Sequence, residues 1–121
     1  MPTWADDYGA GAAPPLVDLR TTLTAHRFVA FSGNPPVAAL CTGGQDADAV
    51  TLDGSQSQGY LAVPGLPVQV ETNAAIASGA TLESDSIGRC ATWVSGAKVA
   101  RALQASTGAG QLIWVVFLSG R

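Results

Sequence analysis

The sequence predicts an all-β fold, either a sandwich or a small barrel, on three observations. Segments rich in β-branched and aromatic residues are short, as in residues 27–31 and 37–41. Clusters of Gly, Pro, Ser and Asn recur about every 8 to 12 residues, a spacing typical of such folds. No apolar stripe of helical period is sustained along the chain. The length of 121 residues fits a single domain.

Residues 1–27 differ from the rest and predict an extended arm and lead-in, followed by a single all-β domain over residues 28–121. Pro, Gly and Ala dominate the start of the chain, and this composition sustains neither a helix nor a central strand. Trp4 and Tyr8 lie in the arm, and both residue types are enriched at protein interfaces. The arm therefore either contacts another protein or is a frayed terminus that folds back on the domain.

Four segments in the first two thirds of the chain are β-branched or alternating and are bounded by Gly and Pro turns. They predict strands over residues 27–31, 37–41, 59–63 and 68–72. Residues 46–59 are polar and rich in Gly, Ser and Gln, so they predict a surface loop, with a possible short strand at residues 49–52.

The last third predicts a corner, a hairpin and a closing strand. Residues 74–79 form either one helical turn or a tight corner, and Gly79 supplies the positive φ that ends either. Residues 81–83 and 89–94 predict the two arms of a hairpin. Residues 111–118 are an almost continuous apolar run, which predicts a strand buried on both faces.

Periodicity leaves residues 98–107 open between helix and strand. Val99 and Leu103 are spaced as one face of a helix requires. The alanines between them reduce the contrast that a strand pattern would show. Both alternatives stay in place at this point.

Charge and hydropathy exclude several classes of function. Charged residues make up 12% of the chain, about half of the ~25% usual for soluble domains, so part of the surface is expected to meet protein. The net charge is −3 and the basic residues are scattered without interleaved aromatics, so no nucleic-acid binding is expected. Every apolar run is short, and we expect neither a signal peptide nor a membrane span.

No set of residues suits catalysis or metal binding, and we expect no enzyme activity, cofactor or metal. His26 is the single histidine, and no Gly-x-Ser-x-Gly sequence accompanies it. The carboxylate pairs Asp46 with Asp48 and Glu83 with Asp85 flank turn sequences, where solvation is the simpler interpretation. They lack the ligand spacing of calcium or zinc sites.

Cys41 and Cys90 are far apart in the sequence and form no CxxC pattern. Two buried thiols are the expected state. A disulfide would form only if the fold brought them together.

The second half of the chain combines an Ala-Gly corner, an Asp-x-x-Gly-Arg hairpin, and an ending of Ala-Leu-x-Ala, Ala-Gly and a strand. The residues concerned are Ile76, Gly79, Leu82, Asp85, Gly88, Arg89, Ala102, Leu103, Ala105, Gly110 and Gln111 through Leu118. Over residues 68–118 this order resembles the C-terminal half of small bacteriophage capsid cement (head decoration) proteins. The resemblance implies a small β-barrel or β-tulip-like domain with an extended N-terminal arm, and it favours a strand over residues 98–107.

The resemblance also implies a structural role in the virion. The chain would bind the outer surface of the phage capsid as a homotrimer at local three-fold positions and stabilise the expanded head. Its partners would be the major capsid protein and its own copies, after synthesis in the host cytoplasm. The expected capsid-binding arm residues are Trp4, Tyr8, Pro14 and Pro15, and the expected subunit-interface residues are Leu66, Trp93 and Val94.

Trp114 lies in the most apolar segment and is predicted to belong to the core. An alternative function is a small β-barrel module that binds a carbohydrate or another ligand in host-surface adhesion. It would use Gln56, Gln58 and Tyr60 of the polar segment, because amide and aromatic side chains are suited to sugars.

Overall fold

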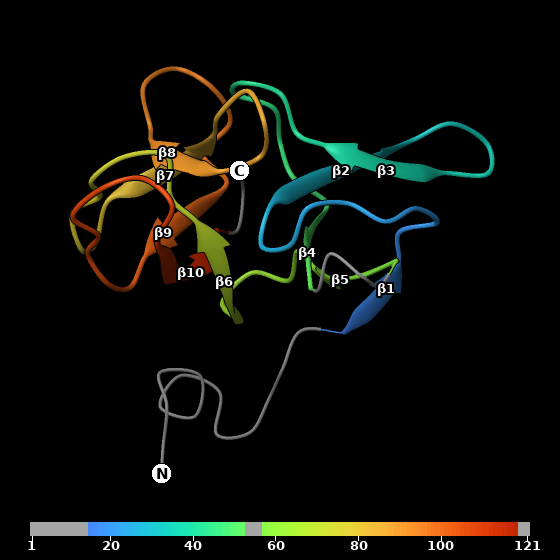
Figure 1. Cartoon of the computed structure of the whole chain (residues 1–121), viewed down its shortest axis with the longest axis horizontal. Helices are drawn as coiled ribbons and strands as arrows, with labels where there is room; N and C mark the ends of the chain where they lie inside the picture. Colours follow the sequence, from blue (N-terminus) through green and yellow to red (C-terminus); the bar gives the residue numbers. More distant parts are fainter. Residues whose placement is uncertain (1–14, 53–56, 119–121) are drawn as a thin grey trace, which may run out of the picture.

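The computed structural model describes residues 15–52 and 57–118, and it contains two five-stranded antiparallel sheets (Figure 1). The strands of the described residues are β1 (Leu16–Asp18), β2 (Phe28–Ser32), β3 (Val37–Leu40), β4 (Ala49–Thr51), β5 (Gln58–Leu61), β6 (Pro67–Glu71), β7 (Thr81–Ser84), β8 (Cys90–Thr92), β9 (Ala100–Ala102) and β10 (Leu112–Phe117). The all-β class is confirmed. The described residues include no helix long and apolar enough to cross a membrane.

The two sheets have the same topology. The first sheet has the order β1-β5-β4-β2-β3 and the second has β6-β10-β9-β7-β8. Counted within each group of five, both orders read 1-5-4-2-3, and every neighbouring pair is antiparallel. The fold is therefore an internal repeat, which we call the first repeat (residues 16–61) and the second repeat (residues 67–117).

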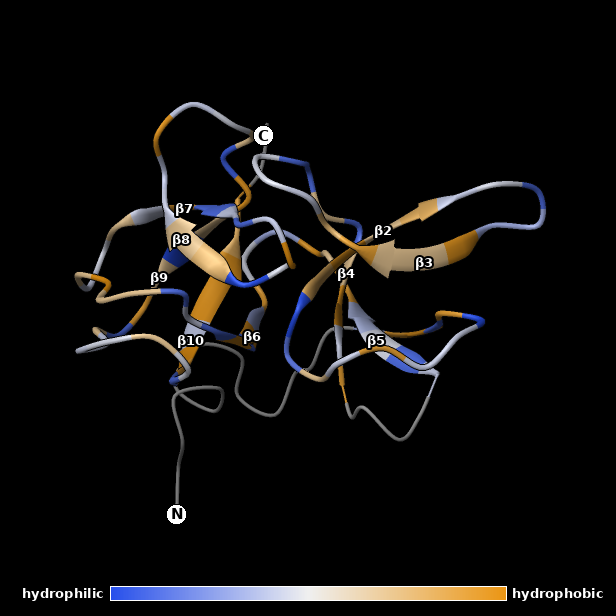
Figure 2. Ribbon diagram, turned by 45° about the horizontal axis from the view of Figure 1, so that its top comes forward, coloured by the Kyte–Doolittle hydropathy of each residue, from blue (hydrophilic) through white to orange (hydrophobic). Residues whose placement is uncertain are grey.

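The main core lies between the two sheets and draws on both repeats. One face of the first sheet contributes Phe28 and Val50, and these pack with residues such as Leu82, Val115 and Phe117 of the second sheet. The Phe28 and Phe117 rings are 6.1 Å apart between centroids and tilted by 59°. Figure 2 shows the hydrophobic colouring concentrated on strands such as β10, while many connecting loops are hydrophilic. Burial of this apolar surface is the main favourable contribution to the free energy of packing between the repeats.

The opposite face of the first sheet has a smaller core of its own. Paired residues of antiparallel strands point to the same face, and this face carries Val29, Ala38 and Ala49. The segment between β1 and β2 covers part of it with Leu19, which is fully buried, and Leu23.

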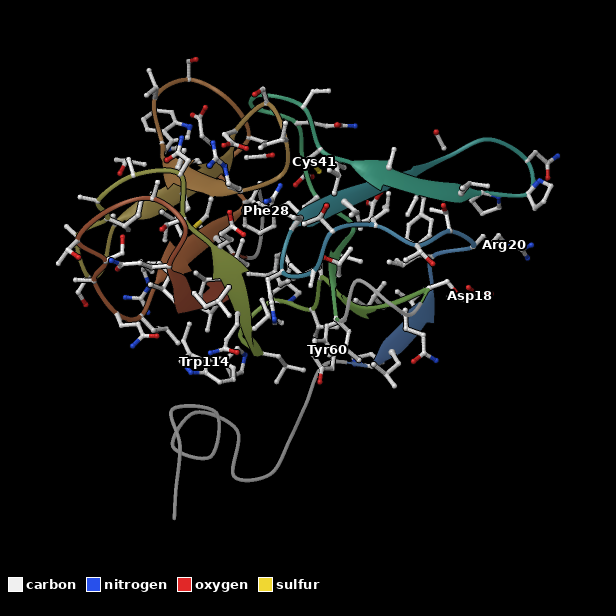
Figure 3. The ribbon with its side chains drawn as sticks, in the orientation of Figure 1. Asp18, Arg20, Phe28, Cys41, Tyr60 and Trp114 are labelled. Carbon is white, nitrogen blue, oxygen red and sulfur yellow. The ribbon has the colours of Figure 1, made fainter. Side chains whose placement is uncertain are left out.

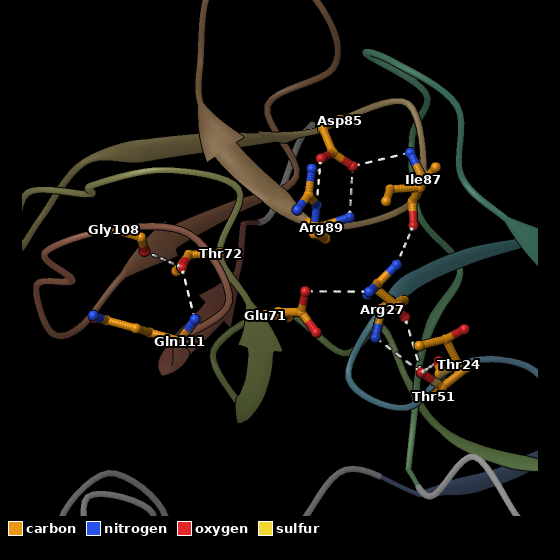
Figure 4. Close-up of polar contacts among 10 residues, drawn as sticks. All are labelled: Thr24, Arg27, Thr51, Glu71, Thr72, Asp85, Ile87, Arg89, Gly108 and Gln111. Atoms are coloured by element: carbon orange, nitrogen blue, oxygen red, sulfur yellow. Dashed lines mark hydrogen bonds and ion pairs between the residues drawn. The ribbon is translucent and has the colours of Figure 1, made fainter.

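Arg27 connects the first sheet to two elements of the second (Figure 4). Its Nη2 atom lies 3.1 Å from Glu71 Oε2 at the end of β6. Its Nη1 atom donates to the carbonyl of Ile87, in the loop between β7 and β8, at 3.1 Å. The Arg27 N–H donates to Thr51 Oγ1 at 2.9 Å. The Arg27 and Glu71 side chains are largely shielded from water, so this ion pair helps to fix the position of the first sheet relative to the second.

The narrower expectation of a small closed barrel is not confirmed. By strand order the edge strands of the described residues are β1 and β3 in the first sheet and β6 and β8 in the second. Single backbone bonds link these edges, from the N–H of Ala38 to the carbonyl of Leu19 and from the N–H of Asn73 to the carbonyl of Cys90, both at 3.0 Å. They do not form a continuous ladder that closes a barrel. The contact between the sheets is made by Phe28, Cys41, Ala47 and Val50 of the first repeat, which join the buried apolar residues of the second.

The prediction of a surface loop over residues 46–59 is wrong at residues 49–51 and 58–59, which belong to β4 and β5, and the strand proposed within it is present. Residues 53–56 lie outside the described part of the chain. β4 is paired on both sides, with β2 and β5, and all three of its residues are buried. Burial of the polar Thr51 is possible because its hydroxyl donates to the carbonyl of Thr24 at 2.6 Å. The polar residues on either side of this strand made the whole segment resemble a loop by composition.

Residues 16–27, which the sequence grouped with the arm, pack on the first sheet. β1 pairs with β5, and the N–H of Leu19 donates to the carbonyl of Ser57 at 2.7 Å. Residues 1–14 lie outside the described part of the chain.

The second repeat agrees more closely with the sequence-based predictions. β7 and β8 form the predicted hairpin, Gly79 has a φ of 84°, and residues 98–107 contain the strand β9 and no helix. The prediction for the last strand is half right. β10 is buried on both faces only toward its C-terminal end, because Leu112 is 43% exposed and Trp114 is half-buried.

Candidate interaction surfaces

The described surface carries several exposed large apolar side chains, namely Leu16, Val37, Leu61, Ile87, Trp93, Val94 and Leu112. Single exposed apolar residues are ordinary on protein surfaces. A binding surface is better supported where such residues line a groove or are held in a fixed loop. Two places meet this condition: the loop of residues 93–98 and a groove on the first sheet.

The loop of residues 93–98 presents two of the predicted interface residues. Val94 is 75% exposed and Trp93 is 37% exposed. Trp93 Nε1 donates to the carbonyl of Gly96 at 2.8 Å, and Lys98 Nζ lies 4.6 Å from the centroid of the Trp93 ring. These contacts orient the indole, so the loop displays an apolar tip of defined shape.

Glu83 holds this loop from β7. Its Oε1 atom accepts N–H bonds from Val94, Ser95 and Gly96 at 2.6, 3.1 and 3.2 Å. The Val94 bond is the main reason that the pKa of Glu83 lies below its ordinary value, and the bonds from Gly96 and Ser95 act in the same direction. The ionised carboxylate is therefore the form that orders the loop.

The first prediction concerns this carboxylate. Since the folded-state pKa of Glu83 is depressed, its stabilising contribution is present above the unfolded-state pKa and is lost as pH falls through the folded-state pKa. We expect Glu83→Gln to be less stable than the unmodified chain at neutral pH. We also expect the difference to shrink in acid, as measured by urea unfolding from pH 7 to pH 3. A difference that stays constant over this range would contradict the role of the charge.

An open groove of about 630 Å³ lies on the first sheet. Its apolar lining includes Val17, Phe31 and Leu61, which point to the face opposite the main core. The remaining lining residues are Asp18, Arg20, Pro36, Asp48 and Ala62. Figure 3 shows Asp18 and Arg20 at the end of the first sheet that is remote from the second.

The charged residues of the groove are fixed by backbone contacts. Asp48 Oδ2 accepts the N–H of Phe31 and Asp18 Oδ1 accepts the N–H of Arg20, both at 2.9 Å. Arg20 itself has a φ of 62°, in the left-handed region. The groove thus combines an apolar floor with two carboxylates and one guanidinium at its border.

The other predicted contact residues are dispersed. Leu66 is half-buried in the turn between β5 and β6, away from the loop that carries Trp93. Pro15 is exposed, and its carbonyl accepts the N–H of Leu61 at 2.9 Å. The arm residues Trp4, Tyr8 and Pro14 lie outside the described residues.

Two aromatic residues differ from what the sequence suggested. Trp114 is not a core residue but half-buried, because Ile113 and Val115 on either side of it take the core face of β10. Tyr60, a candidate sugar contact, packs against the main core and is also only half exposed. Gln58 is exposed, and Gln56 lies outside the described residues.

The residues that were considered for catalysis, His26 and Asp85, make backbone hydrogen bonds that have a structural role. His26 has a φ of 59°, its N–H donates to the carbonyl of Thr51, and its carbonyl accepts from Glu71. Asp85 accepts the N–H groups of Ile87 and Arg89 at 3.0 and 2.8 Å. Within residues 15–52 and 57–118, no three His, Cys, Asp or Glu side chains are grouped as a metal site would need.

Both cysteines are free and buried. Burial raises the pKa of the Cys41 and Cys90 thiols to about 12. Neither thiol is therefore ionised near neutral pH, and both behave as small apolar core residues.

Comparison with known proteins adds a relationship at the level of fold. No family model and no curated protein matches the chain. The fold is similar to that of the head fiber gp8.5 N base in bacteriophage phi29. The TM-score is 0.67, and the similarity covers 84% of this chain and 90% of that chain at 18% sequence identity. Shared architecture, rather than sequence, connects the two proteins.

Sequence reasoning missed the groove. Phe31 and Leu61 come from separate strands, and the topology brings them to one face of the first sheet. The one sequence signal for them was that Phe31 lies in the predicted strand 27–31 and Leu61 in the predicted strand 59–63, which does not indicate a shared face. The repeat was also missed, because its corresponding strands share few residue types.

Proposed function

We propose that this chain is a structural protein of a phage head that binds the outer surface of the capsid. In this proposal it acts as a homotrimer at local three-fold positions, contacts the major capsid protein, and stabilises the expanded head without catalysing a reaction. The supporting observation is the likeness of its fold to a head fiber base, over most of both chains. The low content of charged residues agrees with a surface that is largely covered by protein.

Symmetric repetition would make modest contacts sufficient. A trimer that touches several capsid subunits binds through linked sites, and such linkage can raise the overall affinity by about 10² to 10⁴-fold. The arm residues Trp4, Tyr8, Pro14 and Pro15 would supply anchoring contacts, less the entropic cost of ordering the arm. The loop with Trp93 and Val94 and the turn with Leu66 would contribute to subunit contacts.

The ligand-binding alternative has weaker support. A sugar usually stacks on an accessible aromatic ring, and Tyr60 packs against the main core. Gln58 is exposed, as a sugar contact would require, but the aromatic partner proposed for it is this half-buried Tyr60. The head-binding role is therefore the function that we carry forward.

The second prediction tests the arm. We expect a chain that lacks residues 1–14 to remain folded and oligomeric but to bind assembled heads at least about tenfold more weakly, a loss of about 1.4 kcal/mol. Pro15 is kept because its carbonyl accepts the N–H of Leu61. Cosedimentation with assembled heads of the phage that encodes it measures the affinity, and thermal unfolding verifies the fold.

Two results would count against this proposal in different ways. Undiminished binding by the truncated chain would reject the arm as an anchor but keep the head-binding role. Failure of the full chain to cosediment with heads at micromolar concentration would reject the head-binding role itself.

A further inference from the structure

The two repeats match in their backbone hydrogen bonds as well as in strand order. In the first repeat, N–H groups donate from Asp48 to Val29 O (2.8 Å), from Cys41 to Phe28 O (2.9 Å) and from Leu52 to Gln58 O (3.1 Å). In the second repeat, the corresponding bonds, in the same order, run from Val99 to Leu82 O (2.9 Å), from Trp93 to Thr81 O (2.8 Å) and from Leu103 to Trp114 O (2.9 Å). His26 and Gly79, which donate corresponding bonds to Thr51 and Ala102, both have positive φ. The strand residues of one repeat therefore have defined counterparts in the other.

The contact between the repeats uses different faces of the two sheets. The second repeat offers an acceptor surface that includes Glu71, Gly88 and Phe117. The ring of Phe28 in the first repeat meets that of Phe117 in a tilted contact, and the N–H of Phe28 donates to the Gly88 carbonyl at 2.6 Å. Arg27 pairs with Glu71 at 3.1 Å. The two repeats are thus packed head to tail, and not through equivalent surfaces.

Head-to-tail packing leaves the acceptor surface of the first repeat unused within the chain. By the strand registers, the counterparts of Glu71, Gly88 and Phe117 are Arg20, Pro36 and Leu61. All three counterparts line the open groove. The groove is therefore the same kind of surface that, in the second repeat, is filled by Phe28.

The opposite surface is unused on the second repeat. The counterparts of Phe28, Val50 and Tyr60 are Thr81, Arg101 and Val116, which are neighbours on the outer face of the second sheet. Arg101 is exposed and Thr81 is half-buried, whereas Val116 is buried, so Val116 lies beneath the accessible part of this face. Leu112 and Trp114 point to this same face from β10. We call these five residues the outer face.

We propose that the groove of one copy of this chain binds the outer face of a second copy, repeating between chains the packing that joins the repeats within a chain. The chemistry of the two surfaces is complementary. Val17, Phe31 and Leu61 give the groove an apolar floor that matches Leu112 and Trp114. Exposed Arg101 on the outer face carries the charge opposite to that of Asp18 and Asp48 at the groove, and these two carboxylates outnumber the one like charge there, Arg20.

Such a contact is heterologous, because each copy contributes a different surface to it. Repetition of a heterologous contact gives a closed ring when the rotation between copies closes, and an open filament when it does not. A ring would leave neither surface exposed. This inference rests on the internal repeat alone, so it holds or fails independently of any binding to phage heads.

The third prediction is a cross-linking result. We expect Leu61→Cys protein mixed with Thr81→Cys protein to give a covalent dimer with a short bis-maleimide, because the counterparts Phe117 and Phe28 are in contact. Each single variant alone should give no dimer, since a heterologous contact never places two equivalent residues together. The native thiols are buried with pKa values of about 12 and should remain unlabelled. Denaturing electrophoresis and peptide mass spectrometry identify the product.

A second measurement uses charge insertion. We expect Leu61→Asp to reduce the oligomer to monomer in sedimentation velocity at micromolar concentration, with little change in the melting temperature. Ile87→Asp is the control, because Ile87 is 42% exposed against 38% for Leu61 but lies outside both surfaces. A monomeric unmodified chain would overturn the proposal. So would an oligomer that survives Leu61→Asp, or a dimer cross-linked by Leu61→Cys alone, which would indicate a two-fold contact through the groove.

Discussion

The Phe28→Ala variant is expected to lose about 3–5 kcal/mol of its free energy of unfolding, the range for removal of a buried Phe side chain. Phe28 is fully buried, and its ring contacts Phe117 across the boundary between the repeats. The substitution would leave a cavity where the sheets meet, lined by residues of both. Because small domains are stable by only about 5–15 kcal/mol, much of the folded state would be lost. Urea unfolding followed by fluorescence and circular dichroism measures the change.

Phe31→Ala is the matched control, since Phe31 lies on the same strand but on the opposite face and is only partly buried. Its expected loss of stability is clearly smaller. Equal losses of the free energy of unfolding for the two variants would show that the contact between the sheets contributes no more to stability than a partly buried residue on the opposite face. Separate unfolding transitions in Phe28→Ala would show instead that the repeats fold independently once this contact is removed.

The Gly88→Ala variant is expected to destabilise the chain more strongly than Gly65→Ala. Both glycines have positive φ, 83° and 85°, so each alanine carries the backbone cost of about 1–2 kcal/mol. A Cβ atom at Gly88 would lie 2.6 Å from the carbonyl oxygen of Phe28, whereas one at Gly65 would meet nothing within 4 Å. The clash is with backbone, so the hairpin loop must move away from β2, at a further cost of about 1–3 kcal/mol.

This pair of variants separates backbone strain from packing. The Gly88 carbonyl also accepts the N–H of Phe28 at 2.6 Å, and movement of the loop would weaken that bond. Thermal and urea unfolding of both variants give the comparison. Equal destabilisation would mean that the loop between β7 and β8 can relax without disturbing the first repeat, and that it is not part of the contact between repeats.

The interaction surfaces connect these stability predictions to function. Phe28 and Gly88 make the contact inside one chain, and Leu61 and Pro36 occupy the positions on the first repeat that correspond to parts of the second repeat's acceptor surface. If the contact is used again between chains, subunit assembly and folding depend on the same type of packing.

Local patterns in the sequence were sufficient for the fold class and for most strand positions. The hairpin of β7 and β8 and the positive φ of Gly79 follow from turn residues and from β-branched or apolar segments, which act over a few residues. The low charge and the absence of motif chemistry also follow from composition alone.

Tertiary structure decided what local patterns could not. β4 is central and buried, although the segment around it is polar and resembles a loop, because its neighbours β2 and β5 pair with both of its edges. The groove and the repeat arise from pairings between strands distant in sequence, which bring Leu61 beside Phe31 and give both sheets one order. A sequence pattern shows which residues favour a strand. Which face of that strand is buried, and against what, depends on partners that the chain acquires only on folding.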